Sequence, residues 1–172
     1  MESNVASYNK SFQTIFTKAK GSYLFDKSRN YLDFFTGAGT INYGHNNEKI
    51  NEAMIKYLQD DGILHSLDMD TEAKKRFFDS LDRYILTPRK LDYKIQLCAP
   101  SGANSVEASL KLARKITKRR KVIAFSGSFH GMSLGALSAT ANKYYKNPLF
   151  PTSEVQFLPY ENYLEGLNSL EY

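Results

Sequence analysis

The chain has 172 residues and a formal net charge of +5, and 42% of its residues are hydrophobic and 24% charged. Its length suits one domain or part of a larger one, and its composition is that of a globular protein. No apolar run reaches the ~18–20 residues that cross a membrane, and the polar N-terminus lacks the apolar core of a signal peptide. The mild, scattered basic charge comes without a nucleic-acid-reading module. We therefore expect a cytoplasmic protein that binds neither membrane nor nucleic acid.

The first third of the chain predicts an irregular arm and a hairpin within residues 10–35. Two aromatic-rich runs, 23–25 and 31–35, flank the polar turn 26–30, which is a hairpin signal. A loop rich in glycine and asparagine, residues 36–47, follows the hairpin.

Two helices are predicted next, over residues 48–61 and 71–84. Pro88 comes soon after the second helix and helps to end it. The apolar residues at helical spacing in the first helix are Ile50, Met54, Tyr57 and Leu58. The side chains expected to point inward from the second helix are Phe77, Phe78 and Leu81.

From Asp92 onward the pattern changes to strands that alternate with a helix. Residues 93–99 and 121–127 are predicted strands, the latter apolar enough to be buried on both faces, and a helix over 104–117 lies between them. This order is typical of a right-handed βαβ unit in a parallel sheet. Residues 153–159 predict a third strand.

The helix over 104–117 should place apolar residues along one face, namely Val106, Leu110, Ala113 and Ile116. Asn104 could cap its start, and Glu107 three residues later completes a pair that resembles a capping box. The segment 133–150 predicts a helix start rich in small residues, followed by a loop.

Cys98 is the only cysteine, so an internal disulfide is impossible and a reducing compartment fits. In an apolar strand it is expected to be a small buried side chain. A nucleophilic role is the weaker alternative, because no activating neighbour is evident in the sequence.

The turn Ser101–Ser105 joins the first predicted strand of this region to the helix. Unpaired N–H groups at a helix start attract anions. Gly102 and Ala103 would let a phosphate approach the backbone, and Ser101 and Ser105 offer hydroxyl groups. The turn has neither the P-loop ending nor the dinucleotide fingerprint. Taken alone, it is as consistent with a plain connection as with an anion site.

Phe129, His130 and Gly131 follow the next strand, at the strand end where ligands bind in open α/β sheets. Phe129 could stack on a planar ring. Alternatively, Phe129 is a core residue and His130 an ordinary loop histidine. Adjacent strands would bring this turn and the Ser101–Ser105 turn to one crevice, and the pair together suggests a phosphorylated aromatic cofactor.

Three separated motifs in order resemble the class-III aminotransferases that depend on pyridoxal 5'-phosphate. They are "LDFFTGAGTINYGHNN", "PSGANSVEASLKLARK" and "SFHGMSLGALSATAN", beginning at Leu32, Pro100 and Ser128. The resemblance runs from about Tyr8 to Tyr163. It implies the N-terminal part of the type I fold of pyridoxal-phosphate transferases, an α/β fold with a mostly parallel sheet and flanking helices. Residues 1–70 would form the arm and small-domain segment, and residues 71–172 the first part of the cofactor domain.

The resemblance also implies roles for individual residues. Gly102 and Ala103 would bind the cofactor phosphate through backbone N–H groups, with Ser101 flanking them, while Phe129 would stack on the pyridine ring beside His130. The residues implied at the substrate entrance are Gly37, Ala38 and Gly39. Glu107 would act behind the site or simply cap its helix, with a slight preference for the cap. The stretch from His65 to Met69 lies where family members build a dimer interface.

The family also needs a lysine that forms a Schiff base with the cofactor and an aspartate that pairs with the pyridinium nitrogen. Both are expected well after the Phe129–Gly131 motif, in sequence that this chain does not have. We therefore assign no catalytic residue and no metal ligand. The lysines of the predicted phosphate-site helix, Lys111, Lys115 and Lys118, are expected to be solvated charges.

The similarity is strongest to the ectoine-pathway branch, whose members move the terminal amino group between L-2,4-diaminobutyrate and 2-oxoglutarate, with glutamate and aspartate semialdehyde as the other pair. We expect a fragment that is inactive alone, from an enzyme that is a homo-oligomer when full length and takes amino acid and 2-oxo acid substrates. Two alternatives stay open: another class-III enzyme acting on ornithine, 4-aminobutyrate or another ω-amine, and a non-catalytic remnant.

Overall fold

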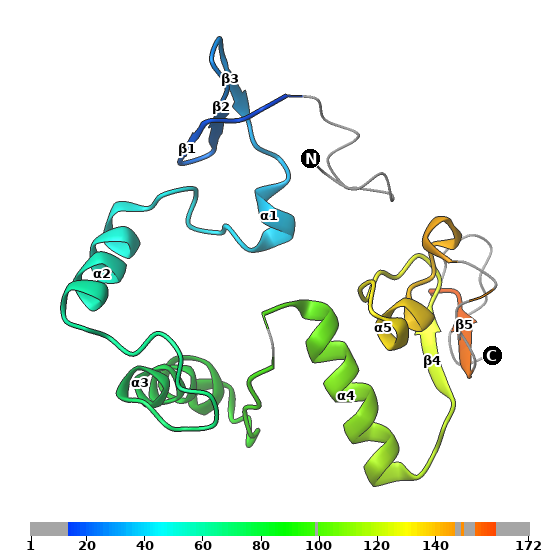
Figure 1. Ribbon diagram of the computed structural model, residues 1–172. Helices are drawn as coiled ribbons and strands as arrows, with labels where there is room; N and C mark the ends of the chain where they lie inside the picture. The colour runs from blue at the N-terminus through cyan, green and yellow to red at the C-terminus, as the bar shows by residue number, and fades with distance from the viewer. Residues whose placement is uncertain (1–13, 99, 147–148, 150–153, 161–172) are drawn as a thin grey trace. The chain divides into compact units, whose positions relative to one another are not determined.

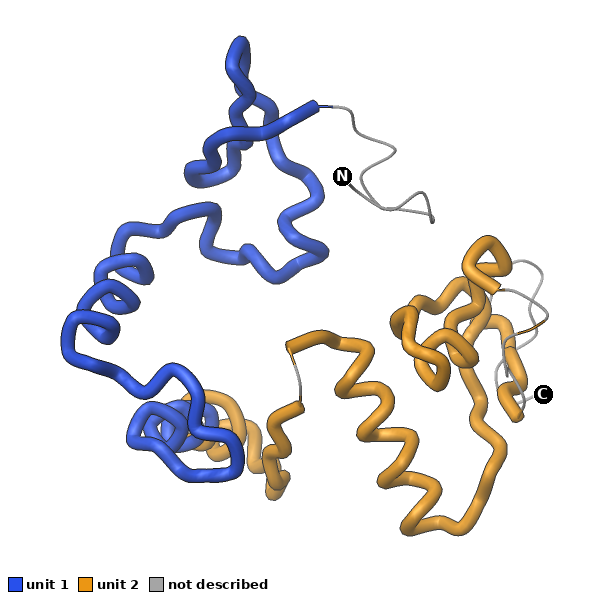
Figure 2. The backbone as a smooth tube through the Cα atoms, viewed as in Figure 1, with its two compact units in different colours: residues 1–81 blue, residues 82–172 orange. Residues whose placement is uncertain are grey.

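The computed structural model describes residues 14–98, 100–146, 149 and 154–160. The chain divides into two units, residues 1–81 and 82–172, which Figure 2 colours blue and orange. Each unit holds its own small sheet, with three antiparallel strands in the first and two parallel strands in the second (Figure 1). The predicted division into segments 1–70 and 71–172 stays a prediction.

The first unit contains, in chain order, β1 (Lys18–Lys20), β2 (Tyr23–Phe25), β3 (Asn30–Leu32), the single turn α1 (Thr36–Gly39), α2 (Glu48–Gln59) and α3 (Glu72–Leu81). The second contains the π-helix η2 (Asp82–Leu86), the 3-10 helix η3 (Thr87–Arg89), α4 (Gly102–Thr117), β4 (Val122–Phe125), α5 (Leu134–Ala139), the 3-10 helix η4 (Lys143–Tyr145) and β5 (Val155–Leu158).

The predicted hairpin is confirmed as β2 and β3, which pair in antiparallel register. Its turn depends on Asp26, whose Oδ1 accepts hydrogen bonds from the backbone N–H groups of Ser28 at 2.7 Å and Arg29 at 2.8 Å. The arm before the hairpin is not wholly irregular, since β1 pairs with β2. The sequence missed β1 because the strand is three residues long and two of them are lysines.

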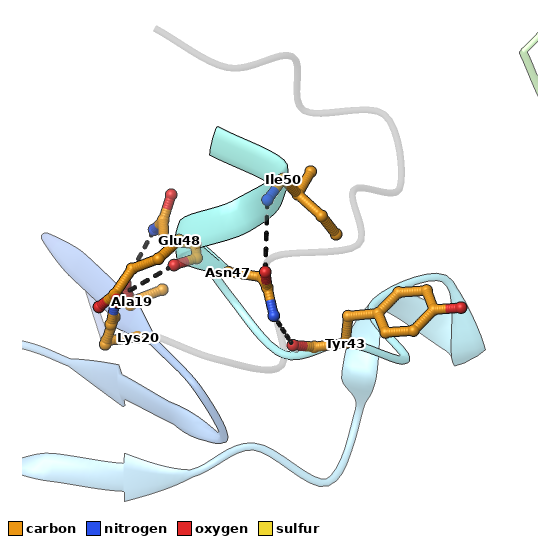
Figure 3. Close-up of polar contacts among 7 residues, drawn as sticks. Ala19, Lys20, Tyr43, Asn47, Glu48 and Ile50 are labelled. Carbon is orange, nitrogen blue, oxygen red and sulfur yellow. Dashed lines mark hydrogen bonds and ion pairs between the residues drawn. The ribbon is translucent and has the colours of Figure 1, made fainter. Parts of the chain in front are cut away.

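The predicted helix over 48–61 is confirmed as α2, and a side chain at its start ties it to β1 (Figure 3). Asn47 caps the helix, because its Oδ1 accepts a hydrogen bond from Ile50 N while its Nδ2 donates to Tyr43 O. Lys20 Nζ lies 2.7 Å from Glu48 Oε1. The predicted apolar residues of this helix are nevertheless more than a third exposed, namely Ile50, Met54, Tyr57 and Leu58.

The second predicted helix is confirmed over Glu72–Leu81 and continues as the π-helix η2 beyond Tyr84. Pro88 lies in the following 3-10 turn. Phe78 and Leu81 are half-buried. The expectation for Phe77 is wrong, since its side chain is 49% exposed.

In the second unit, β4 and β5 pair in parallel from Val122 opposite Val155 to Phe125 opposite Leu158, as the strand pattern predicted. The predicted strand over 93–99 is not formed within the described residues 91–98. A strand needs a hydrogen-bonded neighbour, and the described chain supplies none there. Cys98 is therefore half-buried in irregular chain rather than in a strand.

Burial of β4 on both faces is also wrong. Ala124 is buried, but Ile123 is 63% and Phe125 39% exposed. The hydrophobic residues buried in the described chain are Ala124, Ala136, Leu137 and Ala139. This small core therefore lies at α5 and β4, directly behind the Phe129–Gly131 loop. No helix in the described residues is long and apolar enough to cross a membrane.

Helix α4 begins two residues before its predicted start, and its cap differs from the prediction. Ser101 is the N-cap, and its hydroxyl accepts from Asn104 N at 3.3 Å. Asn104 is already inside the helix. The predicted apolar face of α4 is only partly buried. Val106 and Leu110 in its first half are half-buried, whereas Ala113 and Ile116 in its second half are exposed.

Candidate functional site

The first turn of α4 presents an open backbone. Gly102 and Ala103 are its first two residues, and no described group accepts a hydrogen bond from either backbone N–H. A Cβ added to Gly102 would meet nothing within 4 Å, so the space in front of the turn is free. The 16-residue helix adds the positive end of its dipole at this point. Free donors, open space and a favourable field are what an anion site requires.

The loop with Phe129, His130 and Gly131 lies against this turn. Gly131 has a φ of +127°, and a Cβ there would come within 2.5 Å of Ala103 Cβ and 3.0 Å of Ala103 Cα. Only glycine allows this approach and this backbone conformation without strain. The two turns that the sequence singled out therefore meet, through backbone at Gly131 and a small side chain at Ala103.

Phe129 is not a core residue. Its side chain is 59% exposed, and its ring contacts Tyr145 edge-on, with centroids 5.9 Å apart and planes at 69°. A T-shaped contact covers at most one face of the Phe129 ring, so Tyr145 leaves the other face available for stacking on a planar group. His130 is half-buried beside it.

Thr140 anchors this loop from behind, and the sequence did not point to it. It is fully buried, and its Oγ1 accepts from His130 N at 3.0 Å while lying 3.0 Å from Gly131 O. Ser128, just before Phe129, donates from its hydroxyl to Ala139 O at 3.2 Å. The loop is therefore tied to the end of α5 at several points. No local pattern reveals this, because the bonded residues are nine to eleven positions apart.

Glu107 ties the start of α5 to α4. Its Oε1 accepts from Ser133 Oγ at 2.6 Å and from Ala136 N at 3.0 Å. The Ser133 hydrogen bond is the main reason why the pKa of the Glu107 carboxyl lies below its usual value, and the Ala136 and Gly135 amides reinforce it against the opposing effect of burial. The capping expectation was thus wrong in one respect: Glu107 caps α5, not its own helix.

Gly135 makes room for this carboxylate. A Cβ added at Gly135 would overlap Glu107 Oε2. Ser133 stands at the N-cap position of α5 but makes no capping bond of its own. The carboxylate from α4 therefore takes the capping function that Ser133 would normally perform.

In the first unit, the predicted entrance residues form a left-handed turn. The φ values of Gly37, Ala38 and Gly39 are +56°, +55° and +86°, and Thr36 before them has +47°. Positive φ costs roughly 1–2 kcal/mol for a residue with a side chain. The turn is exposed, and a Cβ added at Gly39 would meet nothing within 4 Å, whereas one at Gly37 would lie 2.6 Å from Thr40 Oγ1.

Asp33 holds this turn in place. Its carboxylate accepts from Phe35 N at 2.8 Å and Thr36 N at 3.1 Å, and it lies 2.7 Å from His45 Nε2. The Asp33 side chain is 5% and that of His45 17% exposed. The His45 hydrogen bond is the main cause that lowers the pKa of Asp33. A cavity of about 240 Å³ lies beside the pair, lined in part by Thr36 and Ile41.

Backbone hydrogen bonds also join the loop 36–47 to the turn between β1 and β2. Gly21 and His45 exchange two backbone hydrogen bonds, at 2.9 and 2.8 Å. Gly44 has a φ of +78°, and a Cβ there would lie 3.1 Å from Gly21 Cα. The sequence did not single out Asp33 or His45, although both lie within the quoted "LDFFTGAGTINYGHNN" motif.

The remaining predicted residues are solvent-facing. His65, Leu67 and Met69 are exposed in the turn after α2, and their interface role stays a prediction. Lys111 and Lys115 of α4 and Lys118 at its C-cap are exposed as expected. Within the residues that the structure describes, no cluster of three His, Cys, Asp or Glu side chains could hold a metal ion.

The chain is similar to a known protein family and to known proteins within it. The family described as aminotransferase class-III matches residues 5–170. A diaminobutyrate–2-oxoglutarate transaminase from Marinococcus halophilus is 51% identical over 99% of the chain, which spans 41% of that relative.

Solved structures agree on the fold. An S-selective transaminase from Bacillus megaterium superposes with a TM-score of 0.77 at 23% identity, over 94% of this chain and 38% of that one. A taurine:2-oxoglutarate aminotransferase from Bifidobacterium kashiwanohense, in complex with PLP and glutamate, gives a TM-score of 0.71 at 25% identity, over 87% of this chain and 33% of that one. The α/β fold is therefore that of one part of these larger transaminases.

Proposed function

The chain belongs to the class-III aminotransferase family, and we propose that it forms the N-terminal part of an enzyme that moves the terminal amino group of L-2,4-diaminobutyrate to 2-oxoglutarate. The observation that carries this proposal is the 51% identity to a diaminobutyrate–2-oxoglutarate transaminase across 99% of the chain. The chain spans about two-fifths of that relative, so the complete activity also needs groups beyond the residues described here.

The cofactor that fits the second unit is pyridoxal 5'-phosphate. The free N–H groups and open space at Gly102 and Ala103 suit its phosphate. The Ser101 hydroxyl accepts from Asn104 N and keeps its own proton to donate. Phe129 offers an exposed ring face, with His130 next to it. When bound, this cofactor supplies an aldehyde that carries the amino group and a ring that acts as an electron sink.

In this proposal the turn of the first unit serves the substrate. Gly37, Ala38 and Gly39 carry little or no side chain, so an amino acid could pass close to their backbone. Asp33 and His45 would keep the turn in its left-handed conformation. The substrates are an amino acid and a 2-oxo acid, and the complete enzyme would be a cytoplasmic homo-oligomer of the ectoine-pathway type.

A chimera tests the activity. The chain is joined to the remaining C-terminal part of the Marinococcus halophilus relative and assayed with 2-oxoglutarate and a panel of amino donors. We expect turnover with diaminobutyrate well above that with ornithine or 4-aminobutyrate, and none from the chain alone. A preference for another donor would redirect the substrate assignment, and a folded but inactive chimera would support the non-catalytic alternative.

Cofactor binding is tested on the chain itself with pyridoxamine 5'-phosphate, which forms no Schiff base with lysine side chains. Gly102→Asp places a negative charge in the open space before the turn, and Gly102→Asn is the neutral control of equal size. We expect the aspartate variant to bind at least about tenfold more weakly than the asparagine variant, because charge repulsion acts only in the former. Equal affinities of the two variants would show that the cofactor phosphate does not bind at this turn.

A further inference from the structure

We propose that Glu107 is a positioning residue, which fixes the Phe129–Gly131 loop relative to the phosphate-binding turn by holding the start of α5 against α4. This inference rests on the cofactor site proposed above. It concerns a side chain that is not expected to touch the cofactor.

The geometry begins with the spacing on α4. Ala103 and Glu107 are four residues apart, so they lie one above the other on the same face of the helix. Ala103 contacts Gly131, at the end of the ring-binding loop. Glu107 binds Ser133 and Ala136, at the start of α5. One face of α4 therefore holds the chain before and after Met132, as a two-point attachment.

The second step concerns the strength of the attachment. A carboxylate at a helix N-terminus accepts hydrogen bonds from otherwise unpaired N–H groups and interacts favourably with the dipole. Glu107 accepts from one hydroxyl at 2.6 Å and one amide at 3.0 Å. Hydrogen bonds to a charged acceptor are roughly twice as strong as neutral ones. The attachment is thus stronger than the contact between Ala103 and Gly131 alone.

The third step links the attachment to the loop. Helix α5 carries the loop at its far end as well, because buried Thr140 binds both His130 N and Gly131 O. A shift of α5 on α4 would therefore move the loop with it. The phosphate turn belongs to α4 and would stay in place. Glu107 thus sets the separation between the phosphate site and the ring of Phe129.

Two ligands separate this role from simple stabilisation. Inorganic phosphate should need only the turn at Gly102, whereas pyridoxamine 5'-phosphate should need the turn and the Phe129 loop together. Binding of both is measured on the whole chain from the amide chemical shifts of Gly102 and Ala103. The variants are Glu107→Ala and Glu107→Gln, and Glu52→Gln on the exposed surface of α2 is the control.

We expect Glu107→Ala to weaken pyridoxamine 5'-phosphate binding about tenfold, which corresponds to ~1.4 kcal/mol, and to leave phosphate binding within a factor of two. Glu107→Gln should fall between, since its amide oxygen still accepts from Ser133. The control should bind both ligands as the wild type does. Gly135→Ala, which displaces the carboxylate without removing it, should repeat the effect of Glu107→Ala and serves if that variant does not fold.

Two results would overturn the inference while the proposed site stands. Unchanged binding of pyridoxamine 5'-phosphate in Glu107→Ala would show that the attachment does not position the loop. Equal weakening of both ligands would show that Glu107 maintains the turn itself. If the wild-type chain binds neither ligand, the cofactor site proposed above is wrong, and the positioning role falls with it.

Discussion

Asp33 and Glu107 are two carboxylates that do similar work in the two units, yet over different distances in the sequence. Asp33 accepts from the amides of Phe35 and Thr36, two and three residues away, and pairs with His45 twelve residues away. Glu107 binds Ser133 and Ala136, which are 26 and 29 residues away. Both carboxyl groups have a lowered pKa.

This difference in sequence separation indicates which part of each unit depends on its carboxylate. Asp33 directly follows β3 and shapes the turn that begins there, so its removal should loosen mainly the residues next to it. Glu107 joins α4 to α5, two elements that lie too far apart in the sequence for local bonds to hold them together. Its removal should therefore change how α5 lies on α4, with larger consequences for the site.

The largest expected effect comes from Gly135→Ala. The new methyl group would displace the Glu107 carboxylate and its hydrogen bonds, which should lower the local stability of α5 by about 2–3 kcal/mol. In a Glu107→Ala background the obstacle is gone. The same substitution should then be neutral or slightly stabilising, because alanine favours helix over glycine.

Amide hydrogen exchange of residues 134–140 in the four variants of this cycle gives the coupling free energy. A coupling close to zero would mean that Gly135 and Glu107 act independently, and the long-range attachment would lose its support.

Thr140→Val tests the other anchor of the same loop. The substitution keeps the shape but removes the hydroxyl that accepts from His130 N and lies against Gly131 O and Ala136 O. We expect a local loss of about 1–2 kcal/mol, because a buried donor is left without its partner. Thr140→Ser keeps the hydroxyl and should retain most of the protection. Exchange of the His130 amide is the measurement, and equal exchange in both variants would contradict the assignment.

Both carboxylates should also make the stability of their surroundings depend on pH in the acid range. A lowered folded-state pKa means that each group contributes stability above its ordinary pKa, 3.8 for Asp33 and 4.5 for Glu107, and loses it as the pH falls through the lower folded value. Carboxyl-carbon NMR shifts should follow both titrations in one sample.

Asp33→Asn isolates the local member of the pair. We expect the Phe35 and Thr36 amides to exchange roughly threefold faster at neutral pH, since a neutral amide is the weaker acceptor. The acid-dependent change at these amides should vanish, while that at Ala136 persists. Loss of protection at Ala136 in this variant would contradict the separation between the two carboxylates.

The same contrast explains what the sequence could predict. The β2–β3 hairpin, α2, α4 and β5 follow from local patterns of apolar and turn residues, and all four are found. The strand expected over 93–99 and the burial of Ile123 depend on neighbours that the described chain does not supply. The meeting of the two site turns could be predicted from their places in the chain. The hydrogen-bond partners of Glu107 could not be predicted, because no local sequence pattern indicates that its carboxylate accepts from a residue 26 positions further along the chain.

The smallest expected effect tests the left-handed turn at residues 36–39 itself. Ala38 has a φ of +55°, so Ala38→Gly should relieve a strain of about 1 kcal/mol. The greater freedom of glycine in the unfolded chain offsets part of that gain and leaves a net stabilisation of about 0.5 kcal/mol. Ala53→Gly, at an exposed position inside α2, is the matched control and should destabilise by about 1 kcal/mol. Greater amide protection of the turn in Ala38→Gly, together with lower protection of α2 in Ala53→Gly, would establish that the positive φ of Ala38 is strained. This is expected if Asp33 holds the turn in that conformation. Equal destabilisation at both positions would mean that the left-handed turn stores no strain for Asp33 to oppose.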